Sequence, residues 1–292
     1  MLTGSVFTDI KHHFRYGNMV MKLIFINSGV FVFFGLFYLV SFLAQNNTAY
    51  IQVLHLCSMP ASLGLFLKQP WAIISYMFLH TALFHFVFNM LWLYWFGEIF
   101  TLYLSDKKVL PLYLYGGLAG GIIYLLAYSF IPVLGQQAAG TYMLGASAGI
   151  FAIVFAAATL APDYEITLAI LGSIKIKYIA VVSLLLDIIN IPYGNAGGYI
   201  AHVGGALTGF LYIKSLQSGL DWAAPFYTIA GWFKPGSRIK VAHKNTTYSN
   251  PGNAKNRSEQ QRVDEILDKI ARSGYNSLTK EEKDFLFRYS KK

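Results

Sequence analysis

Apolar stretches that alternate with short polar segments dominate the first 220 residues. A helix needs about 20 apolar residues to cross the hydrocarbon core of a bilayer, or fewer where one end stops short of the surface. The pattern predicts six helices, at residues 22–44, 80–104, 109–130, 145–161, 176–191 and 200–218. The fifth of these is ambiguous, because Lys175 and Lys177 interrupt an apolar run that begins at Ile166. The two lysines could instead snorkel from a longer helix.

Charged residues are scarce and unevenly distributed. The 292 residues are 55% hydrophobic and 13% charged, and 14 of the 23 Lys and Arg residues follow residue 220. The first 220 residues therefore carry too few charges for the surface of a soluble domain, and we expect a membrane protein. The basic tail suits a cytosolic face beside anionic lipid, and no nucleic-acid partner is expected because no nucleic-acid-binding motif accompanies it.

The basic residues beside the apolar stretches predict the orientation, since loops rich in Lys and Arg stay in the cytosol. The first stretch should remain as a helix, because it is too long for a signal peptide and no A-x-A-like cleavage site follows it. The opposite side carries Lys68 in the long loop 45–79. We expect a multi-pass protein of the cell (inner) membrane with both termini cytosolic. The basic residues expected on the cytosolic side are Lys11, Arg15, Lys22, Lys107, Lys108, Lys175, Lys177 and Lys214.

Polar side chains in three of the predicted helices are expected at one depth. Counting about 1.5 Å per residue from the cytosolic ends places Asn89, Ser147 and His202 at roughly 22, 21 and 18 Å. With a hydrocarbon core of about 30 Å, that level lies about 10 Å beneath the outer surface. Polar groups inside a span are energetically costly, so each of these residues is a functional candidate.

A serine and a histidine at one depth form a candidate catalytic pair. Ser147 is the expected nucleophile, and His202 is the expected base that takes its proton. His85 and Asn89 share a helical face and, with the backbone N–H of Ser147, are expected to bind the oxyanion. Asp187 is interpreted as a cap or polar contact near a loop mouth, with a catalytic role as the alternative.

Small residues would allow the serine and histidine helices to approach closely. Close packing of small residues could by itself account for the sequence GASAGIF, but it does not explain His202. Gly145 is also expected to shape the turn that starts the serine helix, because glycine tolerates positive φ. The small residues concerned are Gly145, Ala148, Gly149 and Ala152 on one helix and Gly205 and Gly209 on the other.

Other functions fit the sequence less well. His80 and His85 are five residues apart and would point about 140° away from each other on a helix, so His80 is expected to support packing, and no metal or cofactor is expected. GASAG matches the serine elbow of soluble hydrolases, but the preceding strand and sheet that an elbow requires are missing from the pattern. No inverted repeat suggests a transporter. The single cysteine, Cys57, excludes an intramolecular disulfide within this sequence.

Taken together, these motifs resemble those of the rhomboid family of intramembrane serine proteases. The resemblance covers about residues 20–218 and rests on His80, His85 and Asn89, on Gly145 and Ser147, and on Ala201, His202, Gly205 and Gly209. It implies an all-α bundle of six transmembrane helices in which a Ser/His dyad cuts transmembrane helices near their outer end. It also implies an oxyanion hole of His85, Asn89 and the Ser147 amide. Many members carry a Trp-Arg pair in the first loop, whereas Ala72 follows Trp71 here.

The expected substrates are single-span membrane proteins whose helices unwind easily near the outer end, where Gly, Pro or β-branched residues would help. A polar cavity open to the outer side is expected, because water must reach the site. The loop 193–201, with Gly194, Gly197 and Gly198, is either a mobile cap over this cavity or a set of plain turns. The alternative function is a non-catalytic rhomboid-like protein that binds transmembrane clients, but such proteins usually lack a dyad member.

The tail is expected to contain a flexible linker and a helical hairpin. Ser258 and Gln261 form a potential capping box for a first helix, and Thr279 and Glu282 form one for a second helix. The hairpin is expected to be cytosolic and to dock on an unknown partner or on the membrane surface, because its core is too small for much stability alone. The expected regions are a cytosolic segment 1–21, a six-helix domain 22–220, a linker 221–257 and the hairpin 258–292.

Overall fold

The computed structural model describes residues 17–168, 172–232 and 254–290. The chain divides into two compact units, Met1–Lys234 and Pro235–Lys292. Most of the predicted N-terminal segment and residues 233–253 of the predicted linker lie outside the described residues.

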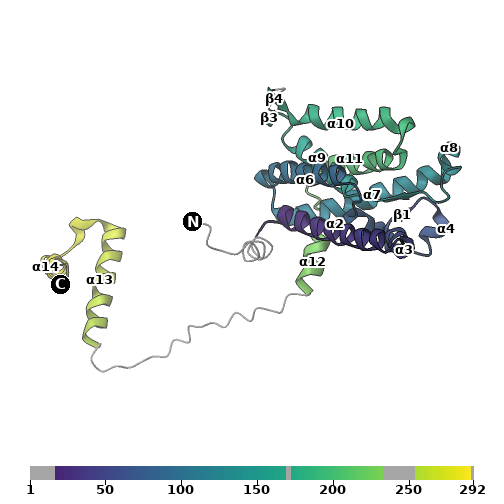
Figure 1. Ribbon diagram of the computed structural model, residues 1–292. Helices are drawn as coiled ribbons and strands as arrows, with labels where there is room; N and C mark the ends of the chain where they lie inside the picture. Colours follow the sequence, from purple (N-terminus) through teal and green to yellow (C-terminus); the bar gives the residue numbers. More distant parts are fainter. Residues whose placement is uncertain (1–16, 169–171, 233–253, 291–292) are drawn as a thin grey trace. The chain divides into compact units, whose positions relative to one another are not determined.

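Within the described residues, a helix is found at each of the six predicted ranges (Figure 1). Four of the described helical segments are long and apolar enough to cross a membrane, namely Met19–Leu43, Leu83–Tyr103, Asp106–Phe130 and Ile176–Tyr193. This supports a multi-pass membrane protein, while the total of six spans stays a prediction. The six helices are α2 (Met19–Leu43), α6 (Leu83–Tyr103), α7 (Val109–Phe130), α9 (Ser147–Leu160), α10 (Ile176–Asn190) and α11 (Ala196–Gln217).

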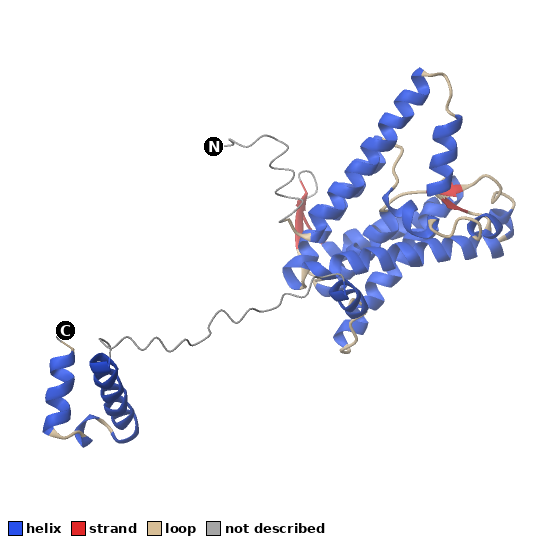
Figure 2. Cartoon of the chain, turned by 90° about the horizontal axis from the view of Figure 1, so that it is seen from below, coloured by secondary structure: helices blue, strands red, loops and turns tan. Residues whose placement is uncertain are grey.

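The expectation of an all-α chain is wrong at four short strands, which form two small sheets and are red in Figure 2. Strand β1 (Met59–Pro60) pairs antiparallel with β2 (Tyr142–Met143), and β3 (Glu165–Leu168) pairs antiparallel with β4 (Gly172–Lys175). The apolar run from Ile166 therefore forms a hairpin, whose β-branched residues favour extended backbone, and not the start of a longer helix. Lys175 and Lys177 do not snorkel from such a helix, because both ammonium groups pair with the Asp163 carboxylate, at 3.0 and 2.8 Å.

The predicted loop 45–79 is folded into short elements. Three side chains close the end of α3 by donating hydrogen bonds to its last carbonyl groups: Gln69 to His55, Trp71 to Leu56 and Ser75 to Cys57. Such donors replace the helical partners that the last carbonyls of a helix lack. The elements of this segment are α3 (Thr48–Cys57), β1, α4 (Leu63–Phe66), α5 (Ala72–Ser75) and the 3-10 helix η1 (Tyr76–Phe78). The remaining short elements of the bundle are η2 (Asp106–Lys108), α8 (Pro132–Gly135) and η3 (Ile191–Tyr193).

Glycines let α7 and α11 approach the backbone of α9 closely. A Cβ atom built on Gly205 would lie 2.0 Å from the Ala148 carbonyl oxygen, and one on Gly209 would lie 2.0 Å from the Ala152 oxygen. On α7, a Cβ on Gly120 would lie 2.7 Å from the Ala148 Cβ atom. Real side chains do not fit at such distances, so these positions admit glycine alone without movement of the helices.

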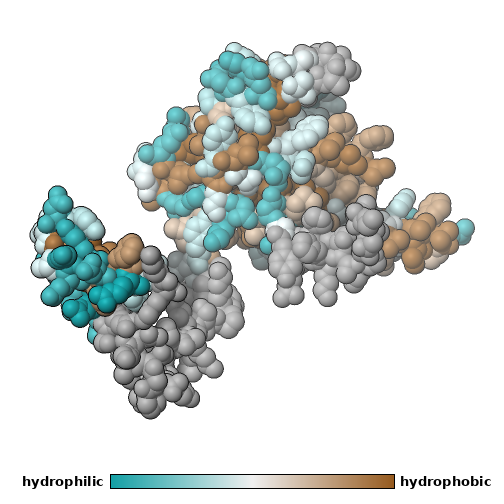
Figure 3. Space-filling model, turned by 90° about the vertical axis from the view of Figure 1, so that its left-hand side faces the viewer, coloured by the Kyte–Doolittle hydropathy of each residue, from teal (hydrophilic) through white to brown (hydrophobic). Residues whose placement is uncertain are grey.

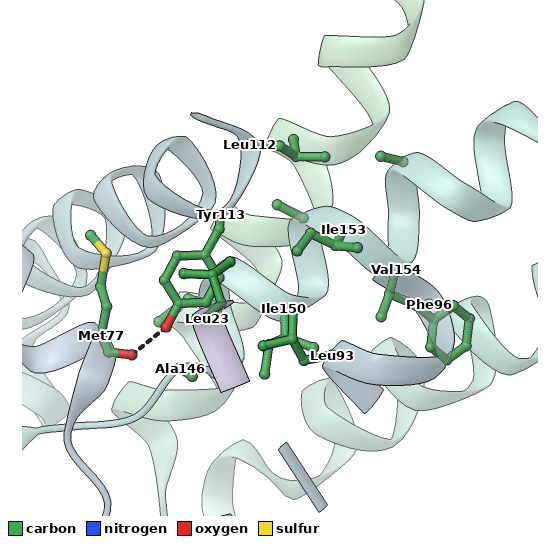
Figure 4. Close-up of a cluster of buried hydrophobic side chains, with 14 of the residues drawn as sticks. Leu23, Met77, Leu93, Phe96, Leu112, Tyr113, Ala146, Ile150, Ile153 and Val154 are labelled. Carbon is green, nitrogen blue, oxygen red and sulfur yellow. Dashed lines mark hydrogen bonds between the residues drawn. The ribbon is translucent and has the colours of Figure 1, made fainter. Parts of the chain in front are cut away.

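The core next to this contact is built from large side chains of several helices (Figure 4). The Tyr113 hydroxyl of α7 donates a 2.5 Å hydrogen bond to the Met77 carbonyl oxygen, which ties η1 to the helices. Other buried side chains of the same cluster are Leu23, Leu93, Phe96, Leu112, Ala146, Ile150, Ile153 and Val154.

The outer faces of α2 and α10 are apolar. Phe33 and Leu43 of α2 are 60% and 71% exposed, and Ile189 of α10 is 61% exposed. Figure 3 shows such apolar side chains, in brown, on the surface of the described part of the chain. Exposed apolar side chains of this kind are typical of helices that face lipid.

The glycine-rich loop 193–201 and the linker 221–257 both contain more helix than the sequence predicts. Helix α11 begins at Ala196, four residues before the expected start, so Gly197 and Gly198 lie in its first turn. A Cβ on Gly197 would lie 2.5 Å from the Tyr124 ring, which shows that this turn is packed. Helix α12 (Ala224–Trp232) lies inside the segment predicted as a linker, where the Tyr115 hydroxyl donates to the Trp222 carbonyl oxygen at 2.9 Å.

The C-terminal unit contains α13 (Ala254–Ser273), η5 (Tyr275–Ser277) and α14 (Lys280–Tyr289). The expected capping box at Ser258 is wrong, because α13 begins four residues earlier, at Ala254, in a run of good helix formers. The capping box of Thr279 and Glu282 is confirmed. Lys269 donates to the Glu282 carboxylate at 2.9 Å, and this hydrogen bond lowers the pKa of the Glu282 carboxyl.

We expect Gly209→Ala to destabilise the bundle by about 3 kcal/mol, because the new methyl group would collide with the backbone of α9. Thermal unfolding in detergent should show a melting temperature about 6–12 °C lower. Gly35→Ala is the matched control, since a Cβ there meets nothing within 4 Å, and it should leave the melting temperature unchanged or slightly higher. Equal melting temperatures for the two variants would contradict the proposed packing.

Candidate active site

Ser147 is the first residue of α9. The backbone N–H groups of a first helical turn have no partners within the helix, so they are free to bind an anion. Gly145 directs the chain into this turn with a φ of 135°, and its N–H donates to the Tyr76 carbonyl oxygen at 2.9 Å. The sequence around Ser147 therefore forms a sharp turn that presents the serine beside a set of backbone donors.

His202 of α11 reaches Ser147 directly. The distance from its Nε2 atom to the Ser147 Oγ atom is 2.6 Å, within hydrogen-bond range. The Phe151 ring, one turn after Ser147 on α9, stacks on the imidazole with ring centroids 4.3 Å apart and planes 13° apart. The serine helix thus supplies both the hydroxyl and the surface against which the histidine ring rests.

Asp187 of α10 contacts the other nitrogen of the same imidazole. Its Oδ2 atom lies 2.7 Å from His202 Nδ1, and the two side chains are 16% and 12% exposed. Asp187 thus makes a polar contact and does not act as a helix cap, and its partner, His202, was not predicted. Distances along single helices give the depth of a residue but do not reveal that α10 faces α11 at this point.

His80 holds the other polar side chains of the site in place. Asn89 Nδ2 lies 3.1 Å from His80 Nε2, and the Ala146 backbone N–H is directed at the same nitrogen from 3.5 Å. His80 is only 2% exposed, as expected for a packing residue. The expectation that His80 and His85 point apart is wrong, because His80 precedes the start of α6 at Leu83 and the two rings lie 5.3 Å apart.

His85 and Asn89 lie on the same side of the site as Ser147. A Cβ atom on Gly145 would lie 3.4 Å from His85 Nε2 and 3.7 Å from Ser147 Oγ, so the imidazole and the hydroxyl flank this glycine. All three side chains line one cavity of about 280 Å³, which also includes Asp187 and His202. The cavity walls are completed by Phe88, Trp92, Ile150, Phe151, Ser183 and Leu186.

The structure also places the predicted supporting glycines of α11 and Ala72 of the first loop. Gly205 and Gly209 lie on the α11 face that contacts α9, one and two turns after His202. Ala72 is completely buried and Trp71 is half exposed, so no basic side chain stands directly after the tryptophan. Among the described residues, no group of three or more His, Cys, Asp or Glu side chains is placed to hold a metal ion.

Comparison with known proteins gives two family matches. The Rhomboid domain matches residues 67–218, which include every polar side chain of the site, and a family of unknown function (DUF6576) matches residues 251–292. RHOMBOID-like protein 12, mitochondrial, from Arabidopsis thaliana is 26% identical over 156 residues, which are 50% of this chain and 46% of that protein. The match thus spans about half the length of that curated relative.

We expect Gly145→Ala to reduce the reactivity of Ser147 by at least about tenfold, because positive φ strains an alanine and the methyl group would press on His85. The rate of covalent labelling of Ser147 by a fluorophosphonate measures this effect. Gly140→Ala is the matched control, since Gly140 also has positive φ (77°) but its Cβ would meet nothing within 4 Å. Equal labelling rates for both variants would show that the turn at Gly145 is not needed.

Proposed function

The chain belongs to the rhomboid family, and we propose that it is an intramembrane serine endopeptidase that cleaves transmembrane helices of client proteins. The observation that carries this proposal is the 2.6 Å contact between Ser147 Oγ and His202 Nε2. An imidazole at this distance can take the proton of the hydroxyl as it attacks a carbonyl carbon. The contact lies in a cavity among largely apolar helices, as an intramembrane protease requires.

The reaction proceeds in two stages. Ser147 Oγ attacks the scissile carbonyl carbon while His202 Nε2 takes its proton, and the resulting imidazolium returns a proton to the leaving amine. Water, activated by the same imidazole, then hydrolyses the acyl-enzyme ester and frees Ser147. Bringing water to this depth requires the polar cavity to open to the outer side of the membrane.

The oxyanion of each tetrahedral intermediate needs hydrogen-bond donors that are already in place. We assign this role to the Ser147 backbone N–H, the Asn89 amide and the His85 imidazole, which all border the cavity. The His80 ring orients the Asn89 amide from 3.1 Å and so fixes one of the donors. Gly145 leaves the space between His85 and Ser147 free for the oxygen.

The cavity favours an unwound substrate. Its volume of about 280 Å³ admits a short extended segment, whereas an intact helix is about 10–12 Å across with its side chains. Peptide carbonyls within a helix are also occupied by backbone hydrogen bonds. The proposed substrates are therefore single-span proteins with Gly, Pro or β-branched residues near the cleavage site.

We further propose that both termini are cytosolic and that the cavity opens to the outer side of the cell (inner) membrane. Basic residues concentrated in the tail and at one set of helix ends support this orientation. The C-terminal unit would then meet a cytosolic partner or the lipid surface. A rhomboid-like protein that binds clients without cutting them is the competing function, and the hydrogen-bonded Ser147 and His202 favour the enzyme.

Purified protein in lipid vesicles should cleave a single-span reporter whose helix is destabilised near its outer end. Ser147→Ala and His202→Ala should each reduce the rate at least about a thousandfold, because each removes one partner of the proton transfer. Gel analysis of the fragments and mass spectrometry of the cut site measure this. Ser28→Ala and His55→Ala are matched controls outside the cavity and should keep the wild-type rate.

Two results would count against the proposed protease. Cleavage that survives Ser147→Ala would exclude the proposed nucleophile. Reporter binding without cleavage by the wild-type protein would favour the client-binding function.

A further inference from the structure

We infer that Asp187 is a positioning residue that extends the serine and histidine pair to a Ser–His–Asp arrangement. This inference rests on the proposed protease function of Ser147 and His202. It assigns a task to the carboxylate of α10, which the dyad implied by the family resemblance does not require.

The imidazole of His202 is held on three sides by three different groups. Ser147 Oγ lies 2.6 Å from Nε2, and Asp187 Oδ2 lies 2.7 Å from Nδ1. The Phe151 ring covers one face of the imidazole at 4.3 Å. Both in-plane nitrogens are thus occupied, and the ring cannot rotate without breaking two short hydrogen bonds.

The contact with Asp187 determines which nitrogen of His202 carries the proton. An ionised carboxylate only accepts hydrogen bonds, so the proton of the neutral imidazole resides on Nδ1. Nε2 is then free to take the proton from Ser147 Oγ. When it does so, the positive charge of the imidazolium lies next to the negative carboxylate, which stabilises the ion pair in an environment with little water.

Apart from His202, no side chain of the described residues forms a hydrogen bond with the Asp187 carboxylate. Between Tyr178 and Asn190, α10 carries Asp187 as its one charged residue, in a sequence of mainly Val, Leu and Ile. The lysine at the start of α10, Lys177, pairs with Asp163 instead. Among the described residues, His202 is the one hydrogen-bond partner of Asp187. A carboxylate in an apolar helix is costly, and the contact with the proposed base explains its presence.

The short connection between α10 and α11 holds Asp187 opposite His202. Asp187 and His202 are 15 residues apart, and the short 3-10 helix η3 connects α10 to α11 directly. The Asn195 side chain accepts from the Gly198 N–H at 3.2 Å and fixes the start of α11. The carboxylate and the imidazole therefore approach each other across a tight connection, with α10 beside α11 (Figure 1).

The test compares Asp187→Asn with wild type in the vesicle cleavage assay. We expect kcat to fall by about a hundredfold or more while KM changes by less than about twofold, because the amide no longer secures the Nδ1–H tautomer or stabilises the imidazolium. The acidic limb of the profile of kcat against pH should also move to lower pH. Asp187→Glu, which keeps a carboxylate on a longer side chain, should recover part of the lost rate.

Asp163→Asn is the matched control, because it removes a carboxylate that lies between α9 and β3, outside the cavity, and pairs with Lys177 at the start of α10. It should keep the wild-type kcat and pH profile. Melting temperatures and gel filtration give the folded fraction of each variant, by which the rates are divided. A kcat for Asp187→Asn within twofold of wild type would overturn the inference, as would a loss that Asp187→Glu does not reverse.

The failure of this inference is distinguishable from failure of the protease proposal. A wild-type protein that cleaves the reporter through Ser147, with Asp187→Asn equally active, would leave a Ser/His dyad without the carboxylate. A wild-type protein that neither cleaves the reporter nor reacts with a fluorophosphonate at Ser147 would overturn the protease itself and with it the role of Asp187.

Discussion

The backbone contact between α9 and α11 is the constraint on which the site depends. Serine and histidine side chains are short, so their helices must nearly touch before Oγ and Nε2 can come within 2.6 Å. Ala148 and Ala152 meet glycines of α11 at positions where a Cβ atom would lie 2.0 Å away, and glycines of α7 contact the same two alanines. Because both neighbouring helices approach α9 at glycines, the serine helix is packed closely against each of them.

Polar groups of the site form two connected sets, one around His80 and one around His202. His80 orders Asn89 and reaches the Ala146 N–H just before the serine. Asp187 and Ser147 are joined through the two nitrogens of His202. An unpaired polar group is expensive among apolar helices, so each pairing both stabilises the fold and orients a group for the proposed reaction.

Sequence patterns predicted the parts of the site that depend on helix geometry alone. Helix positions and the equal depth of Ser147 and His202 follow from apolar run lengths and the rise per residue. The neighbourhood of Asp187 did not follow, because it depends on which helix lies beside α11. His80 was placed on a helix that starts only at Leu83, so its angle to His85 was wrong. The folded loop 45–79 and the β3–β4 hairpin depend on tertiary contacts or short β-branched segments that apolar length does not reveal.

A high-resolution structure of the protein in lipid after reaction with a peptidyl phosphonate would test the central claim most directly. The account predicts a covalent bond from Ser147 Oγ to phosphorus, with the phosphonate oxygen about 2.7–3.1 Å from donors of His85, Asn89 and the Ser147 N–H. His202 should remain between Ser147 and Asp187. A phosphonate attached to another residue, or an imidazole turned away from Ser147 with packed side chains between them, would contradict it.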